Sequence, residues 1–158
     1  MTADETMDSD GQRRLAATLF NATWTLMEQE NRTVYDDDLM VHTAHASAYH
    51  WRQVGTAANF ARSEWQCSRV YALLRRPESS RHHAQRVLDI CTEHGIGDWD
   101  LAFAYEALAR ASGVAGDAEA ARMWTERALT ALEDVADEQD RALVVSDLET
   151  IPGQPRFW

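Results

Sequence analysis

The chain has 158 residues, of which 45% are apolar, and this suits one domain with a modest core. Its formal net charge is −11, so its surface repels phosphate backbones and nucleic acid is not expected as a general partner. All fifteen basic residues are Arg, which leaves no lysine amine for Schiff-base chemistry.

The two cysteines and the N-terminal residues indicate where the protein is located. Cys67 and Cys91 lie far apart in apolar helical stretches without metal-ligand spacing, so we expect reduced core residues in a cytoplasmic protein. Residues 1–10 are acidic and polar, lack the pattern of a signal peptide, and are expected to form a disordered tail. No apolar run approaches the roughly 20 residues that span a bilayer, so no membrane partner is expected.

A single helical domain is expected over residues 11–150. The first helix is predicted at about residues 12–31, because Leu and Ala recur there at helical spacing. A run of three aspartates then favours the start of a second helix, which continues to about Val54. Gly55 ends that helix.

The later helix boundaries are marked by capping residues, glycine and proline. Thr56, Asp98 and Asp137 are expected as N-caps, while Gly95 and Gly116 are expected to end helices. No stretch alternates as a strand does, and short loops favour antiparallel neighbours, so an all-α fold of about seven helices is predicted. The third to sixth helices are predicted at about 57–75, 78–93, 99–113 and 118–135, the seventh reaches residue 150, and residues 151–158 form a tail.

The clearest internal pattern lies in residues 102–129. It consists of a large residue, a Leu–small pair, a Gly–Asp turn and small residues where two helices cross: Ala102, Tyr105, Leu108, Ala109, Gly116, Asp117, Ala121, Ala128 and Leu129. This pattern resembles the tetratricopeptide repeat (TPR). An offset of 41 residues aligns the preceding helix pair, with Ser68 on Ala109 and Ser80 on Ala121, so the small positions are kept there.

The TPR-like resemblance has implications for fold and function. It implies antiparallel helical hairpins stacked as a short right-handed superhelix with a concave groove, and the seventh helix would cover the last face. It also implies binding of a protein or peptide segment, with no cofactor, rather than catalysis. The whole chain resembles a group of bacterial helical-repeat proteins, which adds nothing about chemistry. Because three hairpins form a short groove, a homodimer could complete it.

The resemblance also selects candidate groove residues, because the first helix of each hairpin lines the groove in the family. Carried over to this chain, the groove residues are Arg62, Trp65, Arg69, Phe103, Glu106 and Arg110. Asn59 and Gln66 extend a polar stripe along the same helix as Arg62. Since guanidinium groups hold carboxylates in bidentate pairs, the expected ligand is an acidic segment or a C-terminal carboxylate. The alternative is that these arginines only pair with acidic neighbours on a solvated face.

A second constellation supports an alternative hypothesis. Asp38, His42, His45 and Tyr49 share one helix face, and Glu64 could join them if the second and third helices face each other. Such a set could bind a metal or a small molecule, or act in an enzyme. However, it lacks the spacing of known helical metal sites, so a hydrogen-bonded seam between helices is the simpler interpretation.

Other features favour neither catalysis nor a metal. His82 and His83 are expected on the surface. The sequence contains no nucleophile elbow, no P-loop and no Gly-rich dinucleotide turn. A third hypothesis is therefore a structural dimer whose stacking surface is its function.

Overall fold

The computed structural model describes residues 7–158, and this part of the chain contains helices and no strand. The all-α class with about seven helices, expected from the sequence, is thereby confirmed. In chain order the elements are α1 (Ser9–Glu28), α2 (Val34–Val54), α3 (Ala57–Leu73), α4 (Pro77–His94), α5 (Asp98–Ala115), α6 (Ala118–Ala131), the 3-10 helix η1 (Leu132–Asp134) and α7 (Glu138–Leu148).

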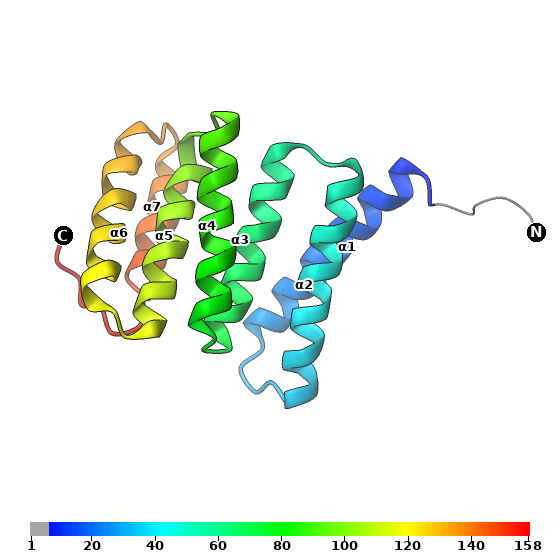
Figure 1. The fold of residues 1–158 in the computed structure, drawn as a ribbon, viewed down its shortest axis with the longest axis horizontal. Helices are drawn as coiled ribbons and strands as arrows, with labels where there is room; N and C mark the ends of the chain where they lie inside the picture. Colours follow the sequence, from blue (N-terminus) through cyan, green and yellow to red (C-terminus); the bar gives the residue numbers. More distant parts are fainter. Residues whose placement is uncertain (1–6) are drawn as a thin grey trace, which may run out of the picture.

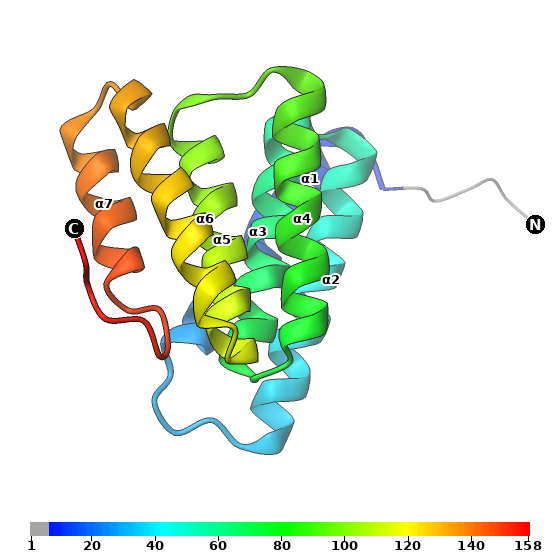
Figure 2. The same ribbon diagram turned by 60° about the vertical axis from the view of Figure 1, so that its left-hand side comes forward.

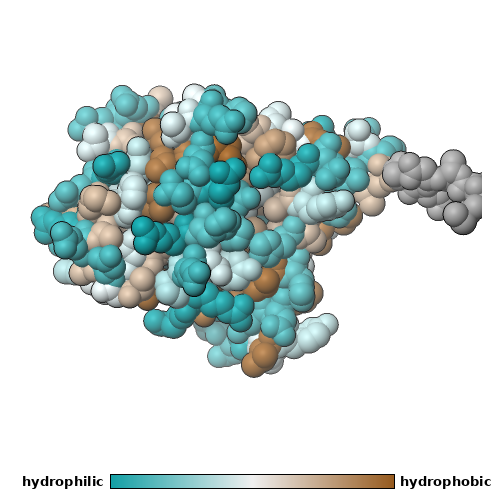
Figure 3. Space-filling model, in the orientation of Figure 1, coloured by the Kyte–Doolittle hydropathy of each residue, from teal (hydrophilic) through white to brown (hydrophobic). Residues whose placement is uncertain are grey.

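The helices form two layers. Consecutive helices pack as the hairpins α1–α2, α3–α4 and α5–α6, and α7 follows at the C-terminal end of the stack beside α5 and α6 (Figures 1 and 2). The odd-numbered helices touch one another along the stack, whereas each even-numbered helix mainly touches its neighbours in sequence. The odd-numbered helices therefore line one side of the stack, which we call the concave side because a row of hollows lies on it. The opposite face, where α2, α4 and α6 lie in front, is mostly hydrophilic (Figure 3).

Most of the predicted caps are present. Thr56 is the N-cap of α3, where its backbone N–H donates to Asn59 Oδ1 at 2.9 Å. Asp137 starts α7 by accepting hydrogen bonds from two backbone N–H groups. Asp98 was wrongly predicted as an N-cap: Gly97 takes that position, and Asp98 begins α5 with a left-handed φ of 55°.

The start of the domain differs slightly from the expectation. Asp8 caps α1 by accepting a hydrogen bond from the Gly11 backbone N–H, so the helix begins at Ser9 instead of after residue 10. A side-chain cap of this kind satisfies a backbone donor that the first turn leaves free. The rest of the predicted disordered tail, residues 1–6, lies outside the described part of the chain.

The segment after α7 is irregular, as predicted, but it packs closely on the domain. Ile151 belongs to the hydrophobic core, and Gln154 donates a hydrogen bond to Thr125 on α6. At Gly113 on α5, an added Cβ would lie 2.7 Å from both the Pro152 carbonyl oxygen and the Ile151 side chain. Only glycine permits this close approach of two backbones, which fixes the segment after α7 against α5.

The crossings within the hairpins contain the small residues that the repeat pattern predicted. Ala109 and Ala121 are fully buried in α5 and α6. At the equivalent crossing of α3 and α4, the Ser68 hydroxyl donates to the Ser80 carbonyl at 2.8 Å and the Ser80 hydroxyl donates to the Ser68 carbonyl at 3.0 Å. These reciprocal bonds satisfy buried hydroxyls while the two backbones stay close.

Both cysteines are free and buried, as expected. Burial raises the pKa of the Cys67 thiol to about 12 and that of Cys91 to about 11, so both thiols stay protonated and unreactive near neutral pH.

No helix between residues 7 and 158 combines the length and the apolar character that a bilayer crossing requires.

Candidate binding groove

Three adjoining hollows follow α3 on the concave side of the stack. The central pocket has a volume of about 440 Å³ and is flanked by hollows of about 130 and 350 Å³. Phe20 and Arg62 line both the first hollow and the central pocket, and Arg69 lines both the central pocket and the third hollow. We call this row the concave groove. It extends along α3 from Asn59 to Leu73, about 21 Å at the helical rise per residue.

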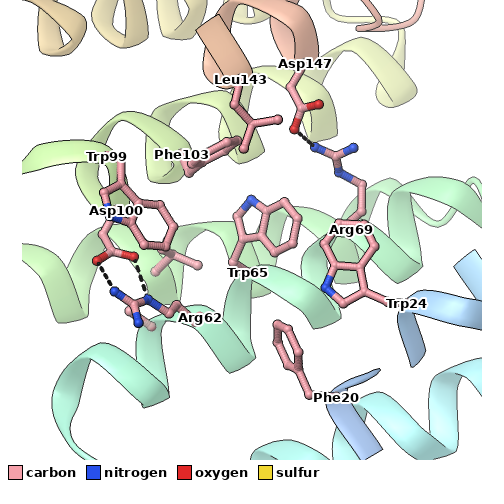
Figure 4. Close-up of a pocket in the computed structure, with 12 residues that line it drawn as sticks. Phe20, Trp24, Arg62, Trp65, Arg69, Trp99, Asp100, Phe103, Leu143 and Asp147 are labelled. Atoms are coloured by element: carbon pink, nitrogen blue, oxygen red, sulfur yellow. Dashed lines mark hydrogen bonds and ion pairs between the residues drawn. The ribbon is translucent and has the colours of Figure 1, made fainter. Parts of the chain in front are cut away.

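The central pocket is walled mainly by aromatic rings from three helices (Figure 4). The rings of Trp24 and Trp65 lie 5.7 Å apart between centroids, and those of Trp65 and Phe103 lie 5.8 Å apart in an edge-to-face arrangement. Phe20 on α1, Trp99 on α5 and Leu143 on α7 extend the apolar wall, to which Ala61 on α3 and Val87 on α4 also contribute. Four odd-numbered helices therefore contribute to one pocket.

Arg62 lies at one side of this pocket and is held by the chain itself. Its Nε and Nη2 atoms donate to the two carboxylate oxygens of Asp100, each at 3.1 Å (Figure 4). Its guanidinium carbon also lies 4.5 Å from the centroid of the Trp99 ring. A bidentate pair with stacking on an indole uses the geometry by which arginine binds carboxylates, so a ligand would have to compete for Arg62.

Arg69 lies at the other side and is also engaged. Its Nη2 atom lies 2.7 Å from Asp147 Oδ2 on α7 and 3.4 Å from Glu106 Oε2 on α5. Burial by itself would lower the pKa of Arg69, but the charges of Glu106 and Asp147 and the hydrogen bonds to them together outweigh that effect and raise the pKa. The guanidinium therefore stays charged and joins three helices.

Glu106 and Arg110 do not line the central pocket, although Arg110 lines the third hollow. Glu106 is 0% exposed and accepts a hydrogen bond from Arg110 Nε at 2.8 Å. Arg110 Nη2 donates to the Asp147 carbonyl and to the Thr150 hydroxyl, both at 2.7 Å. We call Arg69, Glu106, Arg110 and Asp147 the buried arginine network. It fastens α7 to α5 and α3.

The predicted groove residues divide into two groups. The first group lines the hollows. Four of its members line the central pocket, namely Arg62, Trp65, Arg69 and Phe103. The fifth, Asn59, lines the first hollow. Glu106 is buried, Arg110 reaches only the third hollow, and Gln66 is fully buried, where it donates a hydrogen bond to the Phe20 carbonyl on α1. The expectation that the three groove arginines are available to a carboxylate ligand does not fit these contacts, since carboxylates of the chain already occupy them.

Several groove residues were missed by the sequence reasoning. Phe20 and Trp24 on α1, and Leu143 on α7, form pocket walls, although neither helix was assigned to the groove. Arg75 lines the third hollow in a left-handed conformation with φ of 56° and is exposed. Within residues 7–158, its guanidinium has neither an ion pair nor a hydrogen bond.

A separate polar cluster joins α2, α3 and α4 away from the hollows of the concave groove. His45 Nε2 lies 2.9 Å from Tyr71 Oη, and His83 Nδ1 lies 2.6 Å from Glu64 Oε2. The Tyr71 and His83 rings are stacked, with centroids 5.5 Å apart. We call these four residues the histidine cluster. His83, expected as a surface residue, is partly buried and supplies the partner of Glu64.

The electrostatics of the histidine cluster favour neutral His45. Burial lowers the pKa of His45, and the neighbouring His83 lowers it further. Burial alone would raise the pKa of Glu64, but the hydrogen bond from His83 and the charges of His83, Arg52 and Arg86 together outweigh burial and lower that pKa. Such pKa shifts are typical of hydrogen-bonded side chains between packed helices.

The metal hypothesis finds no ligand set in the described structure. Asp38 and His42 are exposed on α2. Among residues 7–158, no three His, Cys, Asp or Glu side chains are grouped so that they could hold a metal ion. His45 and Glu64 are connected through His83, so the condition under which Glu64 could join the set, that α2 and α3 face each other, is met at this point.

No protein-family model matches the chain, and searches of curated proteins and of solved structures found no match either. The function is therefore inferred from the geometry of the concave groove.

Proposed function

We propose that the chain is a TPR-like binding module that holds a segment of a partner protein in the concave groove. An apolar side chain of the partner fills the central pocket, and the adjoining residues follow α3 through the flanking hollows. The observation that carries the proposal is the elongated shape of the groove. About 21 Å of groove accommodates roughly six residues of extended chain, at about 3.3 Å per residue.

The charges along the groove favour an apolar anchor in its centre. Arg62 is paired with Asp100, and Arg69 with Asp147, so both sides of the central pocket are close to electrically neutral. The third hollow differs because Arg75 is free of side-chain partners among the described residues. An acidic side chain or a C-terminal carboxylate of the partner fits best at that end, next to Arg75.

The residues of the central pocket favour binding over catalysis. The side chains lining it include no His, Cys, Ser, Thr, Tyr or Lys among the described residues, and its two carboxylates are paired with arginine. A nucleophile with an adjacent base is therefore not assembled there. The buried thiols fit a cytoplasmic protein, and a homodimer would lengthen the groove.

A second candidate is a small apolar ligand without a protein partner. Its support is the volume of the central pocket, about 440 Å³, which falls in the range of small-molecule sites. Native mass spectrometry of the purified protein separates the two. A reproducible added organic mass that is lost in Leu143→Glu favours the small molecule.

The main test uses a random library of 12-residue peptides, selected against the immobilised protein. The affinity of an enriched peptide is then measured by titration calorimetry for the wild type and for Leu143→Glu. Leu143 lines the central pocket and is 55% exposed, so the substitution is compatible with folding. We expect at least a roughly tenfold loss of affinity, because a carboxylate would be desolvated against the apolar anchor.

The matched control is Met123→Glu on α6, where the side chain is 41% exposed and lies outside the concave groove. This variant adds the same charge to the same type of helix surface and is expected to bind the peptide as the wild type does. Equal affinity of the wild type and Leu143→Glu for every enriched peptide would refute the groove as the binding site.

A further inference from the structure

The indole of Trp65 contains a hydrogen-bond donor that the folded chain leaves unused. Its Nε1 atom is buried and has no partner. Three other buried side-chain atoms of the described residues share this property, on Gln66, Gln154 and Trp158, but none of these residues lines the central pocket. An unpaired buried N–H is costly, and buried polar groups normally have a partner.

The orientation of Trp65 suggests where the missing partner lies. The indole nitrogen points toward the side of the pocket formed by Phe103 and Leu143 (Figure 4). Leu143 is the more exposed part of this wall, since it lies on the surface of α7.

We infer that the occupant of the central pocket presents a neutral carbonyl oxygen beside its apolar group, and that this oxygen accepts a hydrogen bond from Trp65 Nε1. The inference rests on the proposed function and identifies the carbonyl as one from the main chain of the bound segment. An apolar side chain in the pocket places the flanking peptide carbonyls within a few bonds of it.

A neutral oxygen fits this position better than a charged one. Asp147 lies on the same side of the pocket as Leu143 and is already paired with Arg69, so this side supplies no free cation to balance a charged oxygen (Figure 4). Trp65 offers a donor only, so a ligand N–H or ammonium group would leave the indole N–H unpaired. The acceptor of a peptide bond meets both conditions.

The test uses two probes of nearly the same shape that differ in one group, benzophenone and diphenylmethane. The first has a carbonyl where the second has a methylene. Each is titrated into protein with ¹⁵N-labelled tryptophan, and the indole N–H signals are followed by NMR. The signal that Trp65→Phe removes identifies Trp65. We expect benzophenone to shift this signal downfield and to bind about tenfold more tightly, although diphenylmethane is the more hydrophobic probe.

Two variants make the test specific. Trp65→Phe keeps an aromatic ring and loses the donor, so the preference for the ketone should disappear. Trp99→Phe also removes an indole from the wall of the central pocket, but not the unpaired donor. It should weaken both probes alike and retain the preference.

The outcomes separate this inference from the proposed function. Equal binding of both probes to the wild type would refute the hydrogen bond from Trp65 to a carbonyl, but it would still support the central pocket as an apolar binding site. If neither probe binds, both the hydrogen bond to a carbonyl and the central pocket as an apolar binding site would be contradicted. As a peptide probe, N-acetyl-phenylalanine methylamide should shift the same Trp65 signal. If benzophenone shifts the Trp65 signal and the peptide probe does not, the carbonyl does not come from the main chain of a bound segment.

Discussion

The buried arginine network and the histidine cluster both join three helices through titratable side chains, yet they have opposite characters. The first joins α3, α5 and α7 and contains Glu106, which is fully buried. The second joins α2, α3 and α4, and its His45 on α2 is partly covered and partly exposed. Arginine stays charged at all relevant pH values, whereas histidine changes its charge near neutrality. The comparison indicates that one end of the stack is fastened permanently and the other in a pH-dependent way.

The largest effect is expected from Glu106→Ala. The substitution leaves Arg69 and Arg110 without their shared carboxylate in a buried site, which costs about 3–5 kcal/mol of unfolding free energy. Urea denaturation followed by circular dichroism measures the loss. Because Arg69 and Arg110, which bind Asp147, would lose the carboxylate that fixes their positions, the pocket wall formed by Leu143 should also loosen.

The control for that prediction replaces both charges, as Glu106→Leu with Arg110→Met. Two apolar side chains of similar volume remove the unpaired charge, so this double variant should be more stable than Glu106→Ala. If the double variant is less stable than Glu106→Ala, the network contributes more to the free energy of unfolding than the mutual neutralisation of its charges.

An intermediate effect is expected from acid on the histidine cluster. The pKa of His45 is lower in the folded state than its usual value of 6.5, so the unfolded chain binds this proton more readily. Stability should therefore fall as the pH drops below about 6.5 and through the folded pKa. Glu64, whose pKa is lowered from 4.5, loses its contribution as the pH falls further.

Urea midpoints of the wild type and His45→Gln, measured from pH 8 to pH 4, test this behaviour. The variant should lack the upper part of the decline and keep the lower part, which comes from carboxylates such as Glu64. The same slope in both proteins between pH 7 and pH 5 would contradict a contribution from His45.

The smallest effect is expected from Arg62→Gln. Although its contacts resemble those of Arg69, the Arg62 side chain is 42% exposed, and exposed ion pairs contribute about 1 kcal/mol or less. Thermal unfolding should shift by only a few degrees. A loss as large as that of Glu106→Ala would show that exposure does not distinguish the two arginines.

The fold could be predicted well because local signals determine it. Helical spacing and capping residues located the seven helices within a few residues, and the offset of 41 residues placed Ser68 and Ser80 at the small positions of the repeat pattern. Asp98 misled the prediction, since a good capping side chain followed a glycine that could take the N-cap itself. Helix α6 ends at Ala131, earlier than residue 135, because the last turn tightens into η1.

The groove could be predicted only in part, because its polar contacts join residues far apart in the chain. Trp65 and Arg69 followed from the resemblance, whereas nothing local to Arg69 indicates its partner Asp147, 78 residues away. Phe20 on α1 resembles an ordinary core residue in the sequence. For the same reason His83 was taken for a surface residue, since Glu64 is on another helix.

Gly113 has a consequence for how the affinity of this molecule can change. A side chain at this position would push Ile151 and Pro152 away from α5, and these residues immediately follow the helix that carries Leu143 and Asp147. Bulk at residue 113 would thus alter the width of the central pocket from a site that never contacts the ligand. Natural or directed evolution can therefore adjust the strength of binding here without changing which groups the ligand meets.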